Sequence, residues 1–265
     1  MLQFRILVPR TLATLTLLAL TYVSTALLEL PLAAQSRPPA AASALPRTAD
    51  GKPDLQGIWK AARGIAADLT KGVVEGGAIP YQPWAAKKRA ENFAARATAD
   101  PLSNCYMPGV PRIMYLDYPF HIFQTTDAVA ITFEWQQVFR LIHTNATKPA
   151  DGIEFWMGDS RGRWEGDTLA VNVTNHNDRT WFDAAGNFHS EQLTLVERFT
   201  LVDQDTIRYE VTVEDPKVFT KSWKMSLPLS RQKNVTRILE YQCQAEAEEA
   251  NGLFERDPRT WYPKK

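Results

Sequence analysis

The sequence predicts a mainly β protein: an antiparallel meander that closes into a barrel of about eight or nine strands, with one helix in the N-terminal half. Three observations support this prediction. From Phe120 onward, short stretches alternate apolar and polar residues. Turn-forming residues separate these stretches. Each stretch has one apolar and one polar face, as in a curved sheet that wraps a single core. A sandwich of two sheets is the alternative architecture.

The N-terminus reads as a targeting segment. Arg5 and Arg10 precede an apolar run over residues 12–28, and small residues follow it. We expect a signal peptide over residues 1–35 and an exported, periplasmic or secreted protein. An uncleaved anchor is the alternative, because the run approaches the length that spans a bilayer. No later stretch is apolar enough to span, so we expect no stable membrane span after cleavage.

The mature chain reads as a leader followed by one domain. Residues 36–50 are rich in Pro, Ala and Ser, which is typical of a flexible segment. Residues 51–265 suit a single domain. Within it, the charged, alanine-rich stretch 84–97 predicts a helical insertion packed beside or across the barrel mouth.

The strands follow from period-two alternation. They are expected near Gly57–Lys60 and at Ala128–Trp135, Gln137–His143, Thr168–Val173, Gln192–Val202, Thr206–Glu214, Lys221–Leu229 and Val235–Cys243. Asp203–Asp205 predicts a hairpin turn. The stretch before residue 168 reads as turn-rich, because Gly158, Gly162 and Gly166 can adopt positive φ angles.

The tripeptide Gly57-Ile58-Trp59 at the start of the first strand resembles the lipocalin-type signature. In that signature the tryptophan plugs the bottom of the barrel and an arginine from a late strand covers it. Arg237 is the matching arginine expected here. The resemblance implies a lipocalin-like closed barrel.

Longer motifs resemble a family of exported bacterial proteins to which no function is assigned. They are DGKPDLQGIW at 50–59, CYMPGVPR at 105–112, WMGDSRGRWEGDTL at 156–169, FHSE at 188–191 and EYQC at 240–243. The resemblance covers most of the mature chain and implies an exported, β-rich protein. It carries over no catalytic residue, and the residues after Cys243 depart from the family's pattern.

Cys105 and Cys243 are the only cysteines. In an oxidising compartment they can form a disulfide, which the chain-entropy treatment credits with roughly 4–5 kcal/mol. Two independent buried thiols are the alternative.

Composition and motifs exclude several function classes. Lys plus Arg equals Asp plus Glu, so the formal net charge is zero, and we expect no nucleic-acid partner. The sequence contains no Gly-rich phosphate loop, GxSxG elbow or HExxH motif. We therefore expect no cofactor and no metal, and a small-molecule ligand as the partner. The oligomeric state is not indicated.

Glu197 is the sharpest candidate for chemistry. It shares strand parity with apolar neighbours, so a regular strand points it inward, where it can act as a general acid or base or pair with an arginine. A bulge would instead leave it exposed.

His143 and His189 are the candidate proton-transfer partners of Glu197. His143 shares parity with Phe139 and Leu141, which favours a position in the core or cavity. A buried histidine bonded to the backbone is the alternative. His189 ends the long segment 175–190, which suits either a loop that closes over a ligand or a merely solvated loop.

Residues on turns and loops supply the candidate ligand contacts. Within 175–190 these are His176, Asp178 and Trp181, and in the preceding glycine-rich segment they are Trp156, Asp159 and Arg161. Arg161 can hold a carboxylate or carbonyl of a substrate, or it can form a salt-bridged turn with Asp159.

Two functions fit these residues. The first is an exported barrel that binds a small, partly apolar molecule, with cofactor-free acid/base chemistry as an extension. The second is a carrier that does not transform its ligand. A metal-dependent hydrolase that uses His176 and His189 is a further alternative. The first two predict a cavity inside the barrel, rimmed by Trp156, Trp181 and the 175–190 segment.

Overall fold

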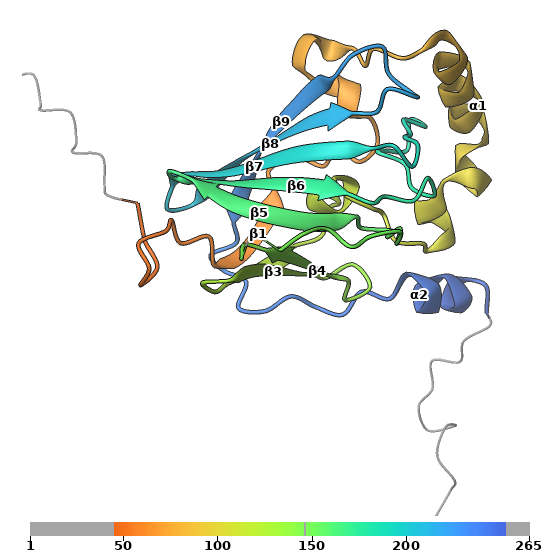
Figure 1. The fold of residues 1–265 in the computed structure, drawn as a ribbon. Helices are drawn as coiled ribbons and strands as arrows, with labels where there is room; N and C mark the ends of the chain where they lie inside the picture. The colour runs from red at the N-terminus through yellow and green to blue at the C-terminus, as the bar shows by residue number, and fades with distance from the viewer. Residues whose placement is uncertain (1–44, 146, 253–265) are drawn as a thin grey trace, which may run out of the picture. The chain divides into compact units, whose positions relative to one another are not determined.

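The computed structural model describes residues 45–145 and 147–252, so the predicted signal peptide over 1–35 and most of the leader lie outside the described residues. The described residues form a mainly β fold in which nine strands close into a barrel (Figure 1), which confirms the predicted fold class. The strands are β1 (Gly57–Ala61), β2 (Phe120–Gln124), β3 (Ala128–Phe133), β4 (Phe139–His143), β5 (Asp159–Glu165), β6 (Thr168–Thr174), β7 (Thr194–Asp203), β8 (Thr206–Glu214) and β9 (Trp223–Arg231). The helices are α1 (Pro83–Ala99) and α2 (Cys243–Ala250), and short 3-10 helices lie at Leu69–Lys71, Glu75–Gly77, Pro101–Asn104 and Arg112–Tyr115.

Each strand pairs with the next along the chain, and β9 closes the barrel on β1. Every pairing is antiparallel except that of β4 with β5. This pair is parallel because the chain crosses over through residues 144–158 instead of turning tightly. Its register contains only Ile142↔Ser160 and His143↔Arg161. The contact between β4 and β5, called the seam below, is therefore the shortest join in the barrel.

The turn-rich stretch before residue 168 is more regular than the sequence suggests. Residues 159–165 form β5, which pairs along its whole length with β6. Gly158 and Gly166 have positive φ angles at its two ends, as expected, whereas Gly162 lies within the strand. A Cβ at Gly162 would lie 2.8 Å from Cγ2 of Ile142, so the missing side chain lets β4 approach β5.

The barrel interior is filled by large side chains. Trp59, Phe120, Phe133, Phe199 and Tyr209 are among the largest fully buried residues, and they project inward from strands around the barrel. Burial of each such side chain is worth about 1.5–3 kcal/mol. The alternation that predicted the strands thus does correspond to an apolar core.

An arginine does cover Trp59, but it is Arg231 at the end of β9 and not Arg237. Its guanidinium carbon lies 4.1 Å from the centroid of the Trp59 ring, and its Nη1 donates to the carbonyl of Gln56 at 2.6 Å. Gly57 makes this approach possible, because a Cβ there would lie 2.3 Å from Nη1 of Arg231. Arg237 lies beyond the end of β9, and Arg231 already occupies the position over Trp59.

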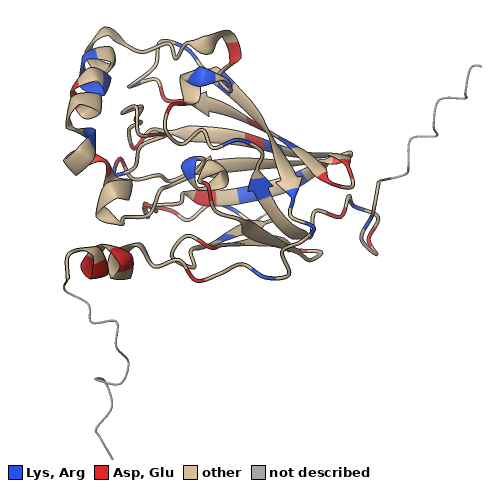
Figure 2. Ribbon diagram, turned by 180° about the vertical axis from the view of Figure 1, so that it is seen from behind, with Lys and Arg blue, Asp and Glu red and all other residues tan. Residues whose placement is uncertain are grey.

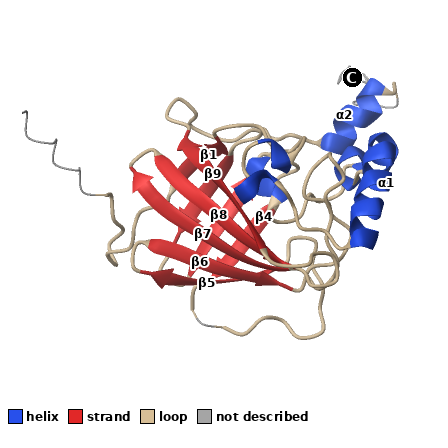
Figure 3. Ribbon diagram, turned by 90° about the horizontal axis from the view of Figure 1, so that it is seen from above, coloured by secondary structure: helices blue, strands red, loops and turns tan. Residues whose placement is uncertain are grey.

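Helix α1 confirms the predicted helix and lies at one end of the barrel. Figures 1 and 3 place α1 and α2 at the same end, opposite the β5–β6 and β7–β8 turns. Helix α1 packs against the segment 175–190: Asn92 Nδ2 donates to the carbonyl of Gly186 at 3.3 Å. Gly186 has a φ of +80° and would carry a Cβ only 2.7 Å from the nitrogen of Phe93, so glycine permits this contact.

The predicted last strand, Val235–Cys243, is wrong. Strand β9 already pairs with β1, so the barrel has no edge left for another strand. The segment instead runs past the turn after β3, where Tyr241 forms a single parallel bridge with Trp135. Cys243 begins α2 and forms the predicted disulfide with Cys105.

The surface carries mixed charge, and no described helix is long and apolar enough to cross a membrane. Figure 2 shows Lys and Arg interspersed with Asp and Glu over the strands and α1, while α2 is acidic.

Candidate ligand-binding groove

A groove of about 680 Å³ lies on the outer side of the seam. One wall consists of residues 136–141 and His143, and the other consists of residues 154–161, with Met107 and Ala150 at the margin. The two walls diverge because β4 and β5 pair only through their C-terminal and N-terminal residues, respectively. The volume falls in the range of small-molecule sites.

Exposed apolar side chains collect at this groove. Phe139 is 72% exposed, and Leu141, Phe155 and Met107 are each at least 37% exposed. All four line the groove. Trp156 also lines it and stacks on the exposed Tyr106, with ring centroids 5.5 Å apart. Exposed apolar side chains gathered around one hollow are more frequent at binding surfaces than elsewhere on a protein surface, which makes this groove the candidate site.

Asp159 and Arg161 form the salt-bridged turn and not a free arginine fork. Arg161 Nε lies 2.7 Å from Oδ1 of Asp159, its Nη2 donates to Oδ2 at 2.8 Å, and its Nη1 donates to Thr147. Burial alone would raise the pKa of Asp159, but the bonds from Arg161 and from the nitrogen of Ala150 hold it below its ordinary value. The pair shapes the groove wall, and Asp159 and Thr147 together hold the guanidinium of Arg161 in place.

His143 is predicted to point into the core or a cavity; it lies on the outer face of β4, so it is not in the core, and the hollow that it reaches is the groove. Its parity with Phe139 and Leu141 is correct, but those two side chains are exposed while Arg140 and Ile142 are buried. His143 is half-buried and lines the groove.

Glu197 does point inward, and no bulge interrupts β7 at this position. It is bound from two sides inside the barrel. Arg140 donates to both carboxylate oxygens, with Nη1 to Oε1 at 3.0 Å, and the Tyr209 hydroxyl donates to Oε1. Arg140 also donates to Oγ of Ser160 on β5 through Nε and Nη2, at 3.0 and 2.9 Å.

This buried network joins strands across the barrel. Arg140 comes from β4, Ser160 from β5, Glu197 from β7 and Tyr209 from β8. Burial alone would lower the pKa of Arg140, but the Glu197 carboxylate outweighs burial and raises it. Burial, followed by the charge of Glu197, raises the pKa of Tyr209 well above its ordinary value. Of the two roles expected for an inward-facing Glu197, the structure therefore shows the ion pair with an arginine.

The segment 175–190 is packed into the barrel end and is not a solvated loop. His176, Asp183, Asn187 and His189 are each at most 2% exposed. Asp183 fixes the segment by accepting hydrogen bonds from main-chain nitrogens, including that of Leu69 at 2.8 Å.

Burial lowers the pKa of both histidines of this segment. His189 is bonded at both ring nitrogens, to Thr180 Oγ1 at 2.7 Å and to the carbonyl of Ser190 at 2.9 Å, and burial lowers its pKa. The His176 ring lies under Gly158 with centroid 5.8 Å from that of His189. Burial, His189 and Arg140 lower its pKa to about 3. Its nitrogens make no hydrogen bond of normal geometry, although the Val173 main chain lies near.

The other predicted ligand contacts divide between the groove and the segment 175–190. Trp156, Asp159 and Arg161 line the groove. Asp178 and Trp181 lie in the segment 175–190, where Asp178 is exposed and Trp181 is half-buried. Trp181 bridges Phe188 in an isolated pairing. The predicted cavity is inside the barrel and rimmed by Trp156, Trp181 and the 175–190 segment, whereas this hollow lies on the outer side of the seam. Of those predicted rim residues, Trp156 alone lines it.

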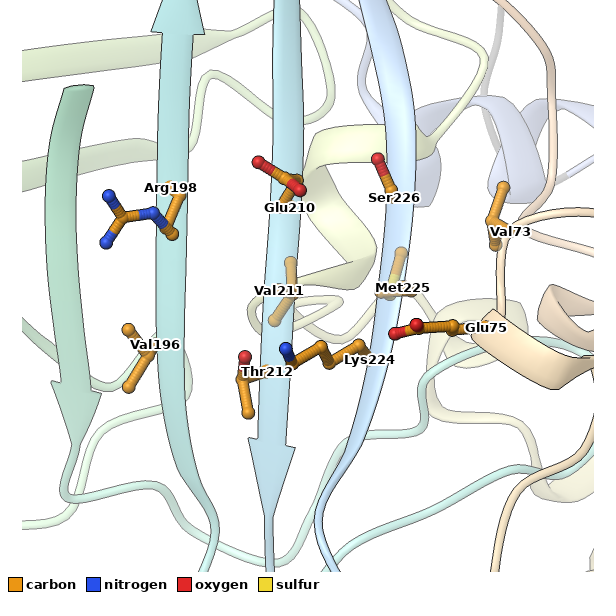
Figure 4. A pocket seen from close by; sticks show the side chains of 10 residues that line it. All are labelled: Val73, Glu75, Val196, Arg198, Glu210, Val211, Thr212, Lys224, Met225 and Ser226. Carbon is orange, nitrogen blue, oxygen red and sulfur yellow. The ribbon is translucent and has the colours of Figure 1, made fainter. Parts of the chain in front are cut away.

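A second hollow, of about 400 Å³, lies on the outer face of β7–β9 (Figure 4). Its walls carry mainly charged and hydroxyl side chains, among them Arg198, Glu210 and Lys224. Arg198 is 2.7 Å from Glu165, and Glu210 is 3.2 Å from Arg208. Its apolar lining residues, Val73, Val196, Val211 and Met225, are not among the large exposed side chains, and surface ion pairs contribute little, so this hollow is a weaker candidate site than the groove.

Within the described ranges, no three His, Cys, Asp or Glu side chains converge on a point that could hold a metal ion. A comparison with protein-family models finds no match to the chain, and a comparison with curated proteins finds none either.

Proposed function

We propose that this protein is an exported binding protein that holds a small, partly apolar ligand in the groove at the seam. The carrying observation is the exposed apolar cluster of Phe139, Leu141, Phe155 and Met107 around a hollow of about 680 Å³. The leader-like N-terminus and the Cys105–Cys243 disulfide support export.

Binding without turnover is the form of this function that we favour. A general acid or base must reach the proton that it transfers. Glu197 is fully buried and bound by Arg140 and Tyr209, and both ring nitrogens of His189 are bonded. The same bonds at His189 disfavour the metal-dependent hydrolase, since a ligating nitrogen has to be free.

We also propose that the chain belongs to the exported family whose motifs it shares. In the fold these motifs include Gly57 and Trp59 at the barrel closure, both disulfide cysteines, and the groove wall at 156–161. We propose a lipocalin-like relationship as well; the arginine that covers Trp59 at the barrel closure supports it.

Titration with the fluorescent apolar probe 1-anilinonaphthalene-8-sulfonate tests the binding site. We expect saturable binding that Leu141→Asp weakens at least tenfold, because the charge would lie in the apolar wall. Phe93→Asp is the matched control, since Phe93 is 42% exposed on α1 and does not line the groove. Native mass spectrometry of protein from its natural host would then identify a retained ligand. Absence of saturable binding, or equal loss in both variants, would refute the proposal.

A further inference from the structure

The groove walls carry main-chain groups that lack partners. In the ladder between β3 and β4, Thr144 N donates to the carbonyl of Asp127 and Phe133 N donates to the carbonyl of Val138, both at 2.8 Å. Because hydrogen-bonding direction alternates along a strand, the even-numbered residues of β4 face β3 and the odd-numbered ones face the seam. The main-chain N–H and C=O of Phe139 and the N–H of Leu141 therefore point toward β5.

Strand β5 does not reach these groups. The register of the seam begins at Ile142↔Ser160, so Phe139 has no partner residue on β5. Phe139 is also largely exposed, which leaves its N–H and C=O accessible from the groove. An unpaired strand edge of this kind is a template for another strand.

The opposite wall also carries main-chain groups without a hydrogen-bond partner. Phe155 is bonded to the 175–177 segment through both its N–H and its C=O. Across the described residues, however, no hydrogen bond engages the main chain of Trp156 or Met157. Since Phe155 faces the 175–177 segment, the alternation along the chain turns the main chain of Trp156 toward the groove, so both walls carry unpaired main-chain groups.

One charged group in the groove is also uncompensated. Arg140 is paired with Glu197, and Asp159 with Arg161, but Glu154 makes no ion pair or hydrogen bond within the described part of the chain. Glu154 is exposed at the groove, so it complements a cationic side chain at one end of a ligand.

We propose that the ligand is a short extended peptide that enters the groove as an added strand between β4 and residues 155–158. Its main chain pairs with Phe139 and the N–H of Leu141 on one side and with Trp156 on the other. Its alternate side chains contact the apolar cluster, and a lysine or arginine near one end meets Glu154. The fold already uses an extended segment in this way nearby, where Tyr241 N donates to the carbonyl of Glu134 at 3.2 Å and Gln136 N donates to the carbonyl of Tyr241 at 2.8 Å.

This inference rests on the proposed binding role of the groove, and peptides can test it separately. The probe is a library of acetylated, amidated hexapeptides that alternate valine or phenylalanine with threonine and carry lysine at one end. The library is mixed with the full mature protein, and bound members are identified by mass spectrometry. For the tightest peptide we expect saturable binding, weakened at least tenfold by N-methylation of the amides that face β4. We expect Glu154→Gln to weaken it several-fold, and to have no such effect on a version of the peptide that lacks the terminal lysine.

Amide hydrogen exchange supplies the positional readout. The N–H groups of Phe139 and Leu141 should exchange rapidly in the free protein and slowly with peptide. Equal binding of the N-methylated peptide, or no selected peptide while the apolar probe still binds, would overturn the peptide inference alone. Slow exchange of both amides in the free protein would mean that another strand already fills the seam, and would overturn it too. Failure of the apolar probe as well would remove the proposed function itself.

Discussion

The buried ion pair formed by Arg140 and Glu197 should stabilise the seam and contribute strongly to the free energy of unfolding. Strands β4 and β5 share only two register pairs, whereas Arg140 ties β4 to β5 through Ser160 and to β7 through Glu197. Both charged side chains are at most 3% exposed. Removal of one partner from a buried ion pair costs about 3–5 kcal/mol, because the other charge remains buried without compensation.

Glu197→Gln is the informative change, since it keeps the shape and the acceptor for Tyr209 but removes the charge. We expect it to lower the free energy of unfolding by about 3–5 kcal/mol. Arg140→Met should lower it by a similar amount, and the double variant should lose less than the sum of the two by about 1–3 kcal/mol. Urea denaturation followed by tryptophan fluorescence gives each value, provided that the slope with denaturant stays constant.

The surface pair Glu191–Lys217 is the control for this cycle. Its atoms lie 3.0 Å apart, as in a strong ion pair, but the side chains are 37% and 50% exposed. Solvent screening should therefore keep the effect of Glu191→Gln below about 1 kcal/mol. The stabilising role of the buried pair would be refuted if Glu197→Gln lowered the free energy of unfolding as little as this control does. It would also be refuted if the losses from the two core changes were additive.

Three further predictions concern other parts of the barrel. The pKa of His176 is about 3 in the folded protein and ordinary when unfolded, so the unfolded chain binds more protons below pH 6.5 and stability should fall as pH drops toward 3. His176→Leu should flatten that slope between pH 6.5 and 5 by up to about 1.4 kcal/mol per pH unit, measured by urea denaturation at each pH; an unchanged slope would count against a neutral buried ring. Gly158→Ala should destabilise more than Gly166→Ala in thermal unfolding, because both have positive φ angles but only at Gly158 would a Cβ lie within 2.9 Å of Val173 and His176; equal losses would contradict this packing. Replacement of Cys105 and Cys243 by serine should cost up to about 5 kcal/mol, and hydrogen exchange should show loosening at 239–252; unchanged exchange there would show that the disulfide does not hold the segment.

Sequence periodicity predicts the strands well where one face is apolar. Strand β8 matches its predicted bounds, and inward-facing Glu197 follows from parity with Leu195 and Phe199. Strand β5 could not be predicted in this way, because its sequence DSRGRWE does not alternate apolar and polar residues.

The groove was only partly predictable for a related reason. Along β4 both parities are apolar except for Arg140 and His143, so the sequence does not say which set faces the core. Arg140 takes the inner face because Glu197 and Tyr209 compensate its charge there. Such partners come from distant strands, and pattern analysis of β4 cannot see them. Trp156, Asp159 and Arg161 follow from the glycine-rich motif, but strand parity assigns Phe139 and Leu141, which define one wall of the groove, to the core or a cavity.

The contact between Gly57, Trp59 and Arg231 has a consequence for how the chain acquires its fold. The register partners Trp59 and Arg231 lie near opposite ends of the described sequence. During synthesis the first strand therefore emerges long before the strand that closes on it, and every intermediate length of chain leaves open edges. Pairing between such distant residues makes a barrel slow to form and exposes unpaired strands meanwhile. We expect that the chain folds only after residue 231 has emerged, so a truncation just before β9 should yield aggregation-prone material and not a smaller stable barrel.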